Sequence, residues 1–228
     1  GIDGAIATSA PNEIVLTNTE IDAEVALSRN DEGVVLTRTP ANGQAIENLS
    51  DEAVVDPNGE TFQYSAVQTD VAGNTSVSSA PYVAVVDPIQ PILSKFALAT
   101  ADNTLANSAL PVPMTRSTRP VLEVQLVDQQ YARLQNTVTV ALFANDDLVN
   151  PIGSGVATFA PQGSTIVGAN TNSTKKVQVT LLPGVEFDPG KQYDLTFVAT
   201  DSAGNTAKLV KQVFILPESS ATQNAPST

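Results

Sequence analysis

Residues 193–205 read YDLTFVATDSAGN, an alternating apolar run followed by a turn. An earlier stretch, residues 62–74, reads FQYSAVQTDVAGN. In each copy an alternating apolar run ends in Thr-Asp, one variable residue and Ala-Gly-Asn. Asp201 follows Asp70, and Asn205 follows Asn74, by the same 131 residues (201 − 70 and 205 − 74). A strand and turn that recur once in this way predict two copies of one domain.

The repeated Thr-Asp-x-Ala-Gly-Asn segment is explained by turn chemistry alone. Asp caps a turn through its own backbone, Gly supplies a positive φ, and Asn tolerates the next strained position. The segment therefore predicts a hairpin loop between two strands, with no ligand required. Tyr193, which opens the second copy, is either a tyrosine corner bonded to the preceding loop or an ordinary half-buried strand residue.

Alternating apolar residues predict strands on both sides of these turns. Residues 121–127 place Leu122, Val124 and Leu126 on one face, and residues 21–27 do the same with Ile21, Ala23, Val25 and Leu27. Strands recur every 8 to 15 residues or so, and no helical period persists for three turns. The chain is therefore expected to be all-β, built from antiparallel β-sandwiches.

A proline-rich linker divides the expected sandwiches. Residues 86–91 read VDPIQP, and two prolines three apart favour stiff, extended backbone. We expect one sandwich over residues 1–87, a larger one over 88–218 with loop insertions, and a linker or disordered tail over 219–228. The polar residues 162–175 are expected to form a mobile excursion.

Composition excludes several classes of function. The 228 residues carry 24 acidic and 11 basic side chains, a formal net charge of −13, so the basic footprint of a nucleic-acid binder is missing. The absence of Cys and His removes disulfides, the usual zinc sites and Cys or His nucleophile chemistry. No run of 18 apolar residues occurs, so we expect no membrane insertion. We expect no enzymatic activity.

The motifs together resemble the bacterial immunoglobulin-like repeats of large surface adhesins of the repeats-in-toxin and biofilm-associated types. The resemblance lies in the aromatic-led strands at residues 62 and 193, the repeated Thr-Asp-x-Ala-Gly-Asn turn, and the Val-Asp-Pro that ends the first unit. It implies two tandem immunoglobulin-like antiparallel β-sandwich domains. It also implies an extracellular protein that is either attached to the bacterial cell surface or secreted. In many such proteins, calcium at the domain junctions stiffens a rod of repeated domains.

Sandwich geometry indicates which carboxylates meet at the junction. The loop after the penultimate strand lies at the N-terminal pole, so Asp201 and Asp128 of the second unit face Asp87 in the linker. Asp56 is expected to reach the same place from the first unit, and Asp70 to serve a junction further upstream. Calcium binds six to eight oxygen ligands, so these aspartates predict a calcium site. The alternative is a linker stiffened by proline alone, with the aspartates as turn residues.

These observations predict a structural extender segment of a large adhesin that supports cell adhesion and biofilm formation. Its partners would be neighbouring immunoglobulin-like domains of the same parent chain and a host or biofilm-matrix ligand, and the chain is expected to be a monomer. Two alternatives stay open. The second domain is a carbohydrate- or protein-binding module, or both domains are accessory parts of a secreted polysaccharide-active enzyme.

Overall fold

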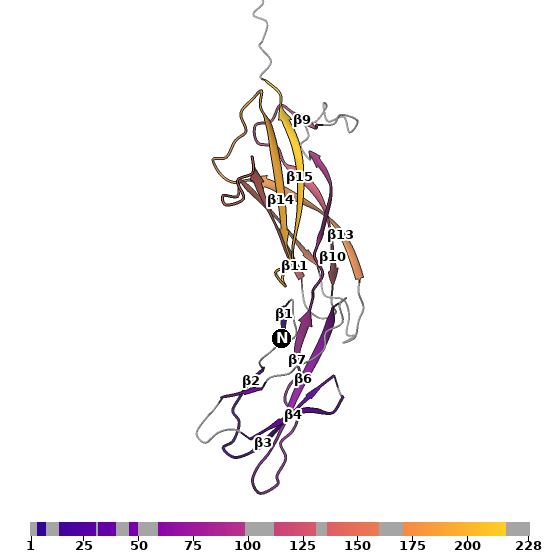
Figure 1. Cartoon of the computed structure of the whole chain (residues 1–228), viewed down its shortest axis with the longest axis vertical. Coiled ribbons are helices and arrows are strands. Elements are labelled where there is room, and N and C mark those ends of the chain that lie inside the picture. Colours follow the sequence, from indigo (N-terminus) through magenta and orange to yellow (C-terminus); the bar gives the residue numbers. More distant parts are fainter. Residues whose placement is uncertain are drawn as a thin grey trace, which may run out of the picture.

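The computed structural model describes residues 4–7, 14–30, 32–39, 46–49, 59–98, 112–130, 136–159 and 171–217. Within these ranges the regular structure consists entirely of β-strands, which confirms the all-β class. The described part of the chain also has no helix that is long and apolar enough to cross a membrane. Figure 1 shows an elongated molecule in which the strands form two groups placed end to end.

The first group, which we call the first sandwich, has a five-stranded and a two-stranded sheet. The larger sheet has the order β1-β7-β6-β3-β4, and the smaller is β2-β5. The strands are β1 (Gly4–Ala7), β2 (Ile14–Thr17), β3 (Glu24–Arg29), β4 (Val34–Arg38), β5 (Ile46–Leu49), β6 (Glu60–Thr69) and β7 (Tyr82–Val86).

The second group, the second sandwich, has the strand order β8-β10-β13-β12-β11-β14-β15-β9. The strands are β8 (Ile92–Leu98), β9 (Met114–Thr115), β10 (Leu122–Gln130), β11 (Asn136–Ala144), β12 (Gly153–Phe159), β13 (Thr171–Leu181), β14 (Gln192–Thr200) and β15 (Thr206–Ile215). Strands β12 and β13 share only two residue pairs, so the order folds into two layers at this point. Layers β8-β10-β13 and β12-β11-β14-β15 have the immunoglobulin arrangement.

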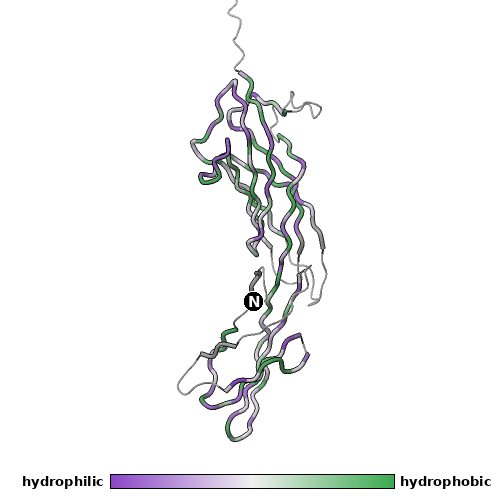
Figure 2. Tube along the Cα trace, in the orientation of Figure 1, coloured by the Kyte–Doolittle hydropathy of each residue, from purple (hydrophilic) through white to green (hydrophobic). Residues whose placement is uncertain are grey.

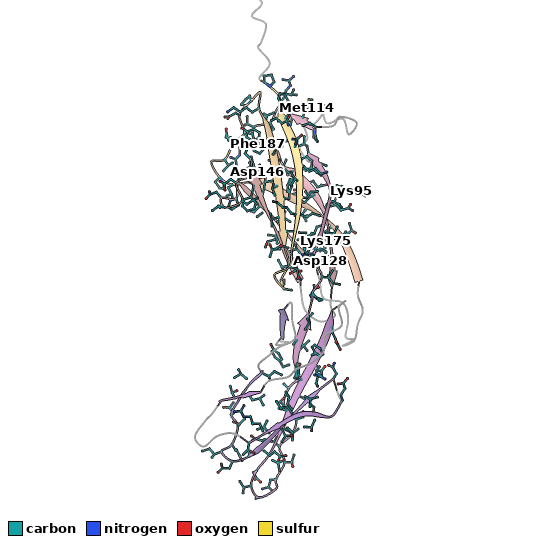
Figure 3. All side chains as sticks on the ribbon, in the orientation of Figure 1. Lys95, Met114, Asp128, Asp146, Lys175 and Phe187 are labelled. Carbon is teal, nitrogen blue, oxygen red and sulfur yellow. The ribbon has the colours of Figure 1, made fainter. Side chains whose placement is uncertain are left out.

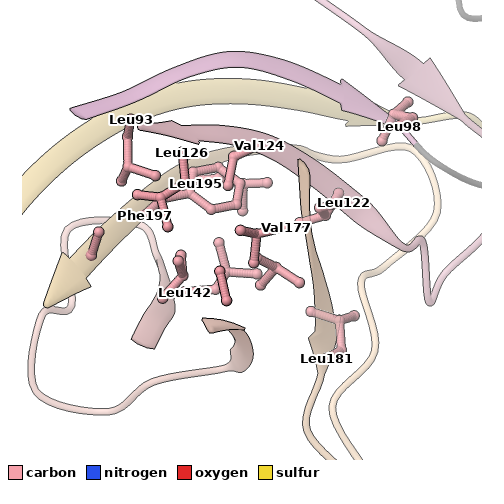
Figure 4. Packing of buried hydrophobic residues seen from close by; sticks show 14 of the residues in the cluster. Leu93, Leu98, Leu122, Val124, Leu126, Leu142, Val177, Leu181, Leu195 and Phe197 are labelled. Atoms are coloured by element: carbon pink, nitrogen blue, oxygen red, sulfur yellow. The ribbon is translucent and has the colours of Figure 1, made fainter. Parts of the chain in front are cut away.

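Each sandwich has its own buried apolar cluster. In the first, Val25, Leu27, Phe62 and Tyr64 are at most 2% exposed and pack with Ile14 of β2. In the second, side chains from both layers converge, among them Leu126, Leu142 and Phe197 (Figure 4). Hydrophilic and hydrophobic residues alternate along several of the strands, as the colours of Figure 2 show.

Strand pairing agrees with the predicted antiparallel sandwiches except at two edges. β1 runs parallel to β7, and β9 runs parallel to β15. These parallel pairs were not predicted, because a two- to four-residue strand gives no periodic signal. They occupy equivalent edges in the two sandwiches. The order β1-β7-β6-β3-β4 in the first sandwich matches the order β9-β15-β14-β11-β12 in the second.

Two local predictions were wrong. Ile21 was placed on the inward face, but it is 55% exposed and lies in the turn before β3, where Asp22 has a φ of 61°. Residues 162–175 were expected to form an excursion, yet residues 171–175 belong to β13 and pair with β10. The polar composition of these residues does not prevent strand formation, because the pairing of neighbouring strands is made by backbone groups. Residues 162–170 lie outside the described residues.

Tyr193 forms the tyrosine corner. Its hydroxyl oxygen accepts a hydrogen bond from the backbone N–H of Asp188, five residues upstream, at 2.8 Å. The Tyr193 ring also packs against Phe187, with ring centroids 4.4 Å apart. Phe62 holds the equivalent place in the first sandwich and has no hydroxyl, so the corner is specific to the second.

Candidate metal centre

The repeated turn is closed by the same side-chain clamp in both sandwiches. In the second, Asp201 Oδ1 accepts from the backbone N–H of Asn205 at 2.8 Å, and Asp201 Oδ2 accepts from Asn205 Nδ2 at 2.9 Å. In the first, Asp70 makes both bonds with Asn74, at 2.8 and 2.7 Å. We call each pair an Asp–Asn clamp.

The prediction that Asn occupies a strained backbone position in the repeated turn was wrong. Gly73 and Gly204 have φ values of 86° and 94°, as predicted, but neither Asn74 nor Asn205 has a positive φ. Asn is therefore not needed for backbone strain at this position. It is needed because its side-chain amide reaches back to the aspartate that begins the turn.

The second clamp also binds the first sandwich. Asn205 Nδ2 donates to the backbone carbonyl of Asp87 at 2.7 Å, across the junction. Asp87 directly follows β7, and its Oδ1 accepts from the backbone N–H of Ile89 at 3.0 Å. The junction is thus held by a direct hydrogen bond between the two sandwiches. Turn chemistry alone did not predict this bond. The only signal in the sequence was that Asn recurs at the last position of the repeated turn.

Three aspartates meet beside this bond. Carboxylate oxygens of Asp87, Asp128 and Asp201, one from each residue, all lie within 4.8 Å of one another. The three residues are 1%, 2% and 6% exposed. Asp128 comes from β10, where it pairs with Ser173 of β13, and Figure 3 shows it at the end of the second sandwich that faces the first. We call these three residues the junction aspartates.

Burial disfavours the ionised form of Asp87. Burial, together with the neighbouring Asp201 charge and against the lowering effect of the Ile89 N–H, raises the pKa of Asp87 to about 6. Buried carboxylates that lie this close repel one another unless protons or a cation offset their charge. Oxygen donors in a partly enclosed site are the ligands that calcium prefers. The residues present therefore fit a divalent cation.

Of the other two predicted ligands, the structure describes Asp70, which was predicted to serve a junction further upstream. Asp70 lies at the opposite pole of the first sandwich, and its hydrogen bonds to Asn74 lower its pKa. In the described part of the chain, no cluster of three metal-ligating side chains includes Asp70. Asp56 lies outside the described residues.

Comparison with known proteins gives structural neighbours only. No family model and no curated protein matches the chain. One similar solved structure is the Streptococcus agalactiae AgI/II polypeptide BspA C-terminal domain (wild type). It is 11% identical, the match covers 84% of each chain, and the TM-score is 0.32. A second, BspA_C_WT, is 11% identical with a TM-score of 0.31, and the match covers 74% of this chain and 62% of that one.

Proposed function

We propose that this chain is an extender segment of a large bacterial surface or secreted adhesin, in which a calcium ion at the junction aspartates fixes the two sandwiches relative to each other. The observation that carries the proposal is the meeting of Asp87 with Asp128 and Asp201, because it joins carboxylates from both sides of the linker in a buried site. The motifs that resemble adhesin repeats support the broader role in adhesion and biofilm formation.

The proposed ion would have three residues as its carboxylate ligands. Asp87, Asp128 and Asp201 would hold it, and the ion would offset their mutual repulsion. The Asp201–Asn205 clamp orients Asp201 within its turn, and the Asn205 bond to the Asp87 carbonyl keeps the linker against the second sandwich. A bound ion would then resist bending at the linker, because movement of either sandwich would separate its ligands.

A calcium titration by calorimetry on the whole chain tests this proposal. We expect saturable binding of about one ion, and Asp87→Ala should abolish it. Glu186→Ala is the control and should bind as the parent chain does. Glu186 is an exposed residue between β13 and β14, and its loss removes the same charge from the chain. Absence of binding heat, together with an unchanged melting temperature in calcium, would contradict the proposal. The alternative function would then be that of a carbohydrate- or protein-binding module in the second sandwich.

A further inference from the structure

The connection between β11 and β12 presents two aliphatic side chains to solvent. Leu148 and Val149 are 46% and 83% exposed. Asp147 fixes the backbone around them, because its Oδ1 accepts from the backbone N–H groups of Val149 and Asn150, at 2.9 and 3.2 Å. Its Oδ2 also accepts from Asn150 Nδ2, at 3.1 Å. These bonds order the turn before any partner binds, and we call Leu148 and Val149 the apolar knob.

The first sandwich shows that the fold does not require this knob. Asn30 and Asn145 begin equivalent turns, because their backbone N–H groups donate to the carbonyls of Gln63 and Asp194, which are 131 residues apart (194 − 63). From these residues the first turn reads NDEG, whereas the second reads NDDLVNP. The aliphatic pair therefore belongs to the longer turn of the second sandwich, and its exposure shows that it does not fill the core.

A small apolar hollow opens beside the knob. Its volume is about 190 Å³, and Pro151, two residues after Val149, lines it together with Ala141, Val156 and Leu182. None of its lining residues has an ionisable side chain. Drug-sized ligands occupy pockets of roughly 300 to 1,000 Å³, whereas a cavity of about 150 Å³ holds a group the size of benzene. This hollow, which we call the β11–β12 hollow, therefore suits a single aliphatic side chain.

Charges of opposite sign stand beside the knob and beside the hollow. Asp146 is exposed and directly precedes the aspartate that orders the knob. Lys208 is also exposed, and it shares a face of the sheet with Ala141, because both residues are neighbours of Val198 in the strand pairing. Two strand spacings place Lys208 roughly 10 Å from Ala141. Figure 3 shows Asp146 farther from the first sandwich than Asp128, so this surface is separate from the junction.

We propose that a second copy of this chain covers this surface, with the apolar knob of each copy in the β11–β12 hollow of the other. Asp146 of each copy would then lie beside Lys208 of the other. A two-fold axis produces both contacts at once, because the knob and the hollow adjoin on one molecule. A second copy is the occupant that the surface itself specifies, since it supplies an aliphatic side chain for the hollow and an opposite charge for Lys208.

The contact is small, so the pair should be weak, with a dissociation constant in the micromolar range or above. Such a pair forms where molecules are crowded, as neighbouring copies on one surface are. The proposal departs from the monomer expected from the sequence. It goes beyond the extender role and does not depend on the junction aspartates.

Sedimentation equilibrium of the whole chain over a range of concentrations tests the proposal. Each copy carries a net charge of −13, so about 0.15 M salt is needed to screen the overall repulsion. We expect a monomer–dimer equilibrium. Val149→Ser should raise the dissociation constant about tenfold or more, because the hollow loses its aliphatic partner. Val77→Ser is the matched control, since Val77 is 90% exposed in the first sandwich, and it should associate as the parent chain does.

Exchange of the two charges tests the pairing directly. Asp146→Lys alone and Lys208→Asp alone should each weaken self-association, because like charges then meet at both ends of the pair. An equal mixture of these two variants should associate again, since both charge contacts of the mixed pair join opposite signs. All the substituted side chains are exposed, so the variants should fold as the parent chain does, which circular dichroism checks.

Three results would overturn the proposal. The first is a parent chain that stays monomeric up to about 1 mM. The second is a Val149→Ser variant that associates as tightly as Val77→Ser. The third is a mixture of the two charge variants that associates no more tightly than either variant alone. The second and third results would place the contact elsewhere on the molecule.

Discussion

At the residue scale, one clamp has two different surroundings. Asp70–Asn74 and Asp201–Asn205 share their hydrogen bonds almost bond for bond, yet the first is exposed and the second is part-buried at the junction. The same side chains can therefore be compared with and without a neighbouring sandwich. Variants at the two clamps can therefore distinguish the contribution of the turn to stability from the contribution of the junction.

Asn205→Ala should destabilise the chain more than Asn74→Ala. Asn205 Nδ2 donates to Asp201 and to the Asp87 carbonyl, so its loss leaves part-buried acceptors unpaired and should cost roughly 2 kcal/mol. Among the described residues, the Asn74 side chain bonds only to exposed Asp70, where water can replace it, and a smaller loss is expected. Urea denaturation of the two variants measures the difference. Equal losses would show that the junction bond contributes nothing.

Asp87 should make stability depend on pH. Its pKa is about 6 in the folded chain and 3.8 in the reference state, so the folded chain binds more protons between these values. The free energy of unfolding should therefore fall as pH rises from about 4 to about 6, by on the order of 2 kcal/mol. Urea midpoints measured with a chelator present test this. Asp87→Asn should flatten the curve, and a slope that survives in the variant would assign it to another group.

At the element scale, two glycines let one strand leave its layer. A Cβ on Gly155 would lie 2.4 Å from the backbone oxygen of Gln178, and one on Gly153 would lie 2.7 Å from that of Thr180. Strand β13, which pairs with β10 along most of its length, can therefore approach β12 at its end. The close approach joins the two layers of the second sandwich.

Gly155→Ala should destabilise the second sandwich by roughly 2 to 4 kcal/mol, because the added methyl group meets backbone that has little room to shift. Ser154→Ala, an exposed residue in the same strand, is the control and should change the melting temperature little. Differential scanning calorimetry compares them. A Gly155→Ala variant that melts with the parent chain would show that β13 can move away from β12.

At the scale of the whole molecule, the junction sets the shape. The direct hydrogen bond from Asn205 and the cluster of junction aspartates both involve Asp87, at the start of a short, proline-containing linker. The proposed ion would convert this contact into a rigid joint. Without it, ionisation of buried Asp87 beside Asp201 works against close approach of the two sandwiches when the pH is above about 6.

Small-angle X-ray scattering should report this difference. With calcium, the chain should scatter as one elongated particle of fixed length, and a chelator should broaden the distribution of lengths. Asp128→Asn should scatter like the chelated parent chain in either condition, whereas Glu186→Gln should behave like the parent. Identical curves with calcium and with chelator would mean that proline and the direct hydrogen bond already fix the joint.

The all-β class could be predicted from local sequence patterns, and so could the position of most strands and the repeated turn. Alternating apolar residues and turn formers act locally, so strand periodicity and Gly204 could be interpreted without coordinates. The pole on which Asp87, Asp128 and Asp201 lie followed from the up-and-down order of strands. That these three residues are buried within 4.8 Å of one another was decided by the tertiary structure.

Tertiary structure alone decided the remaining features. The Asn205 bond to the Asp87 carbonyl joins atoms 118 residues apart, and turn chemistry contains no information about such a partner. The parallel pairs β1–β7 and β9–β15 likewise depend on distant segments coming together. Backbone pairing and burial are made between strands, so they leave no periodic signal within one strand.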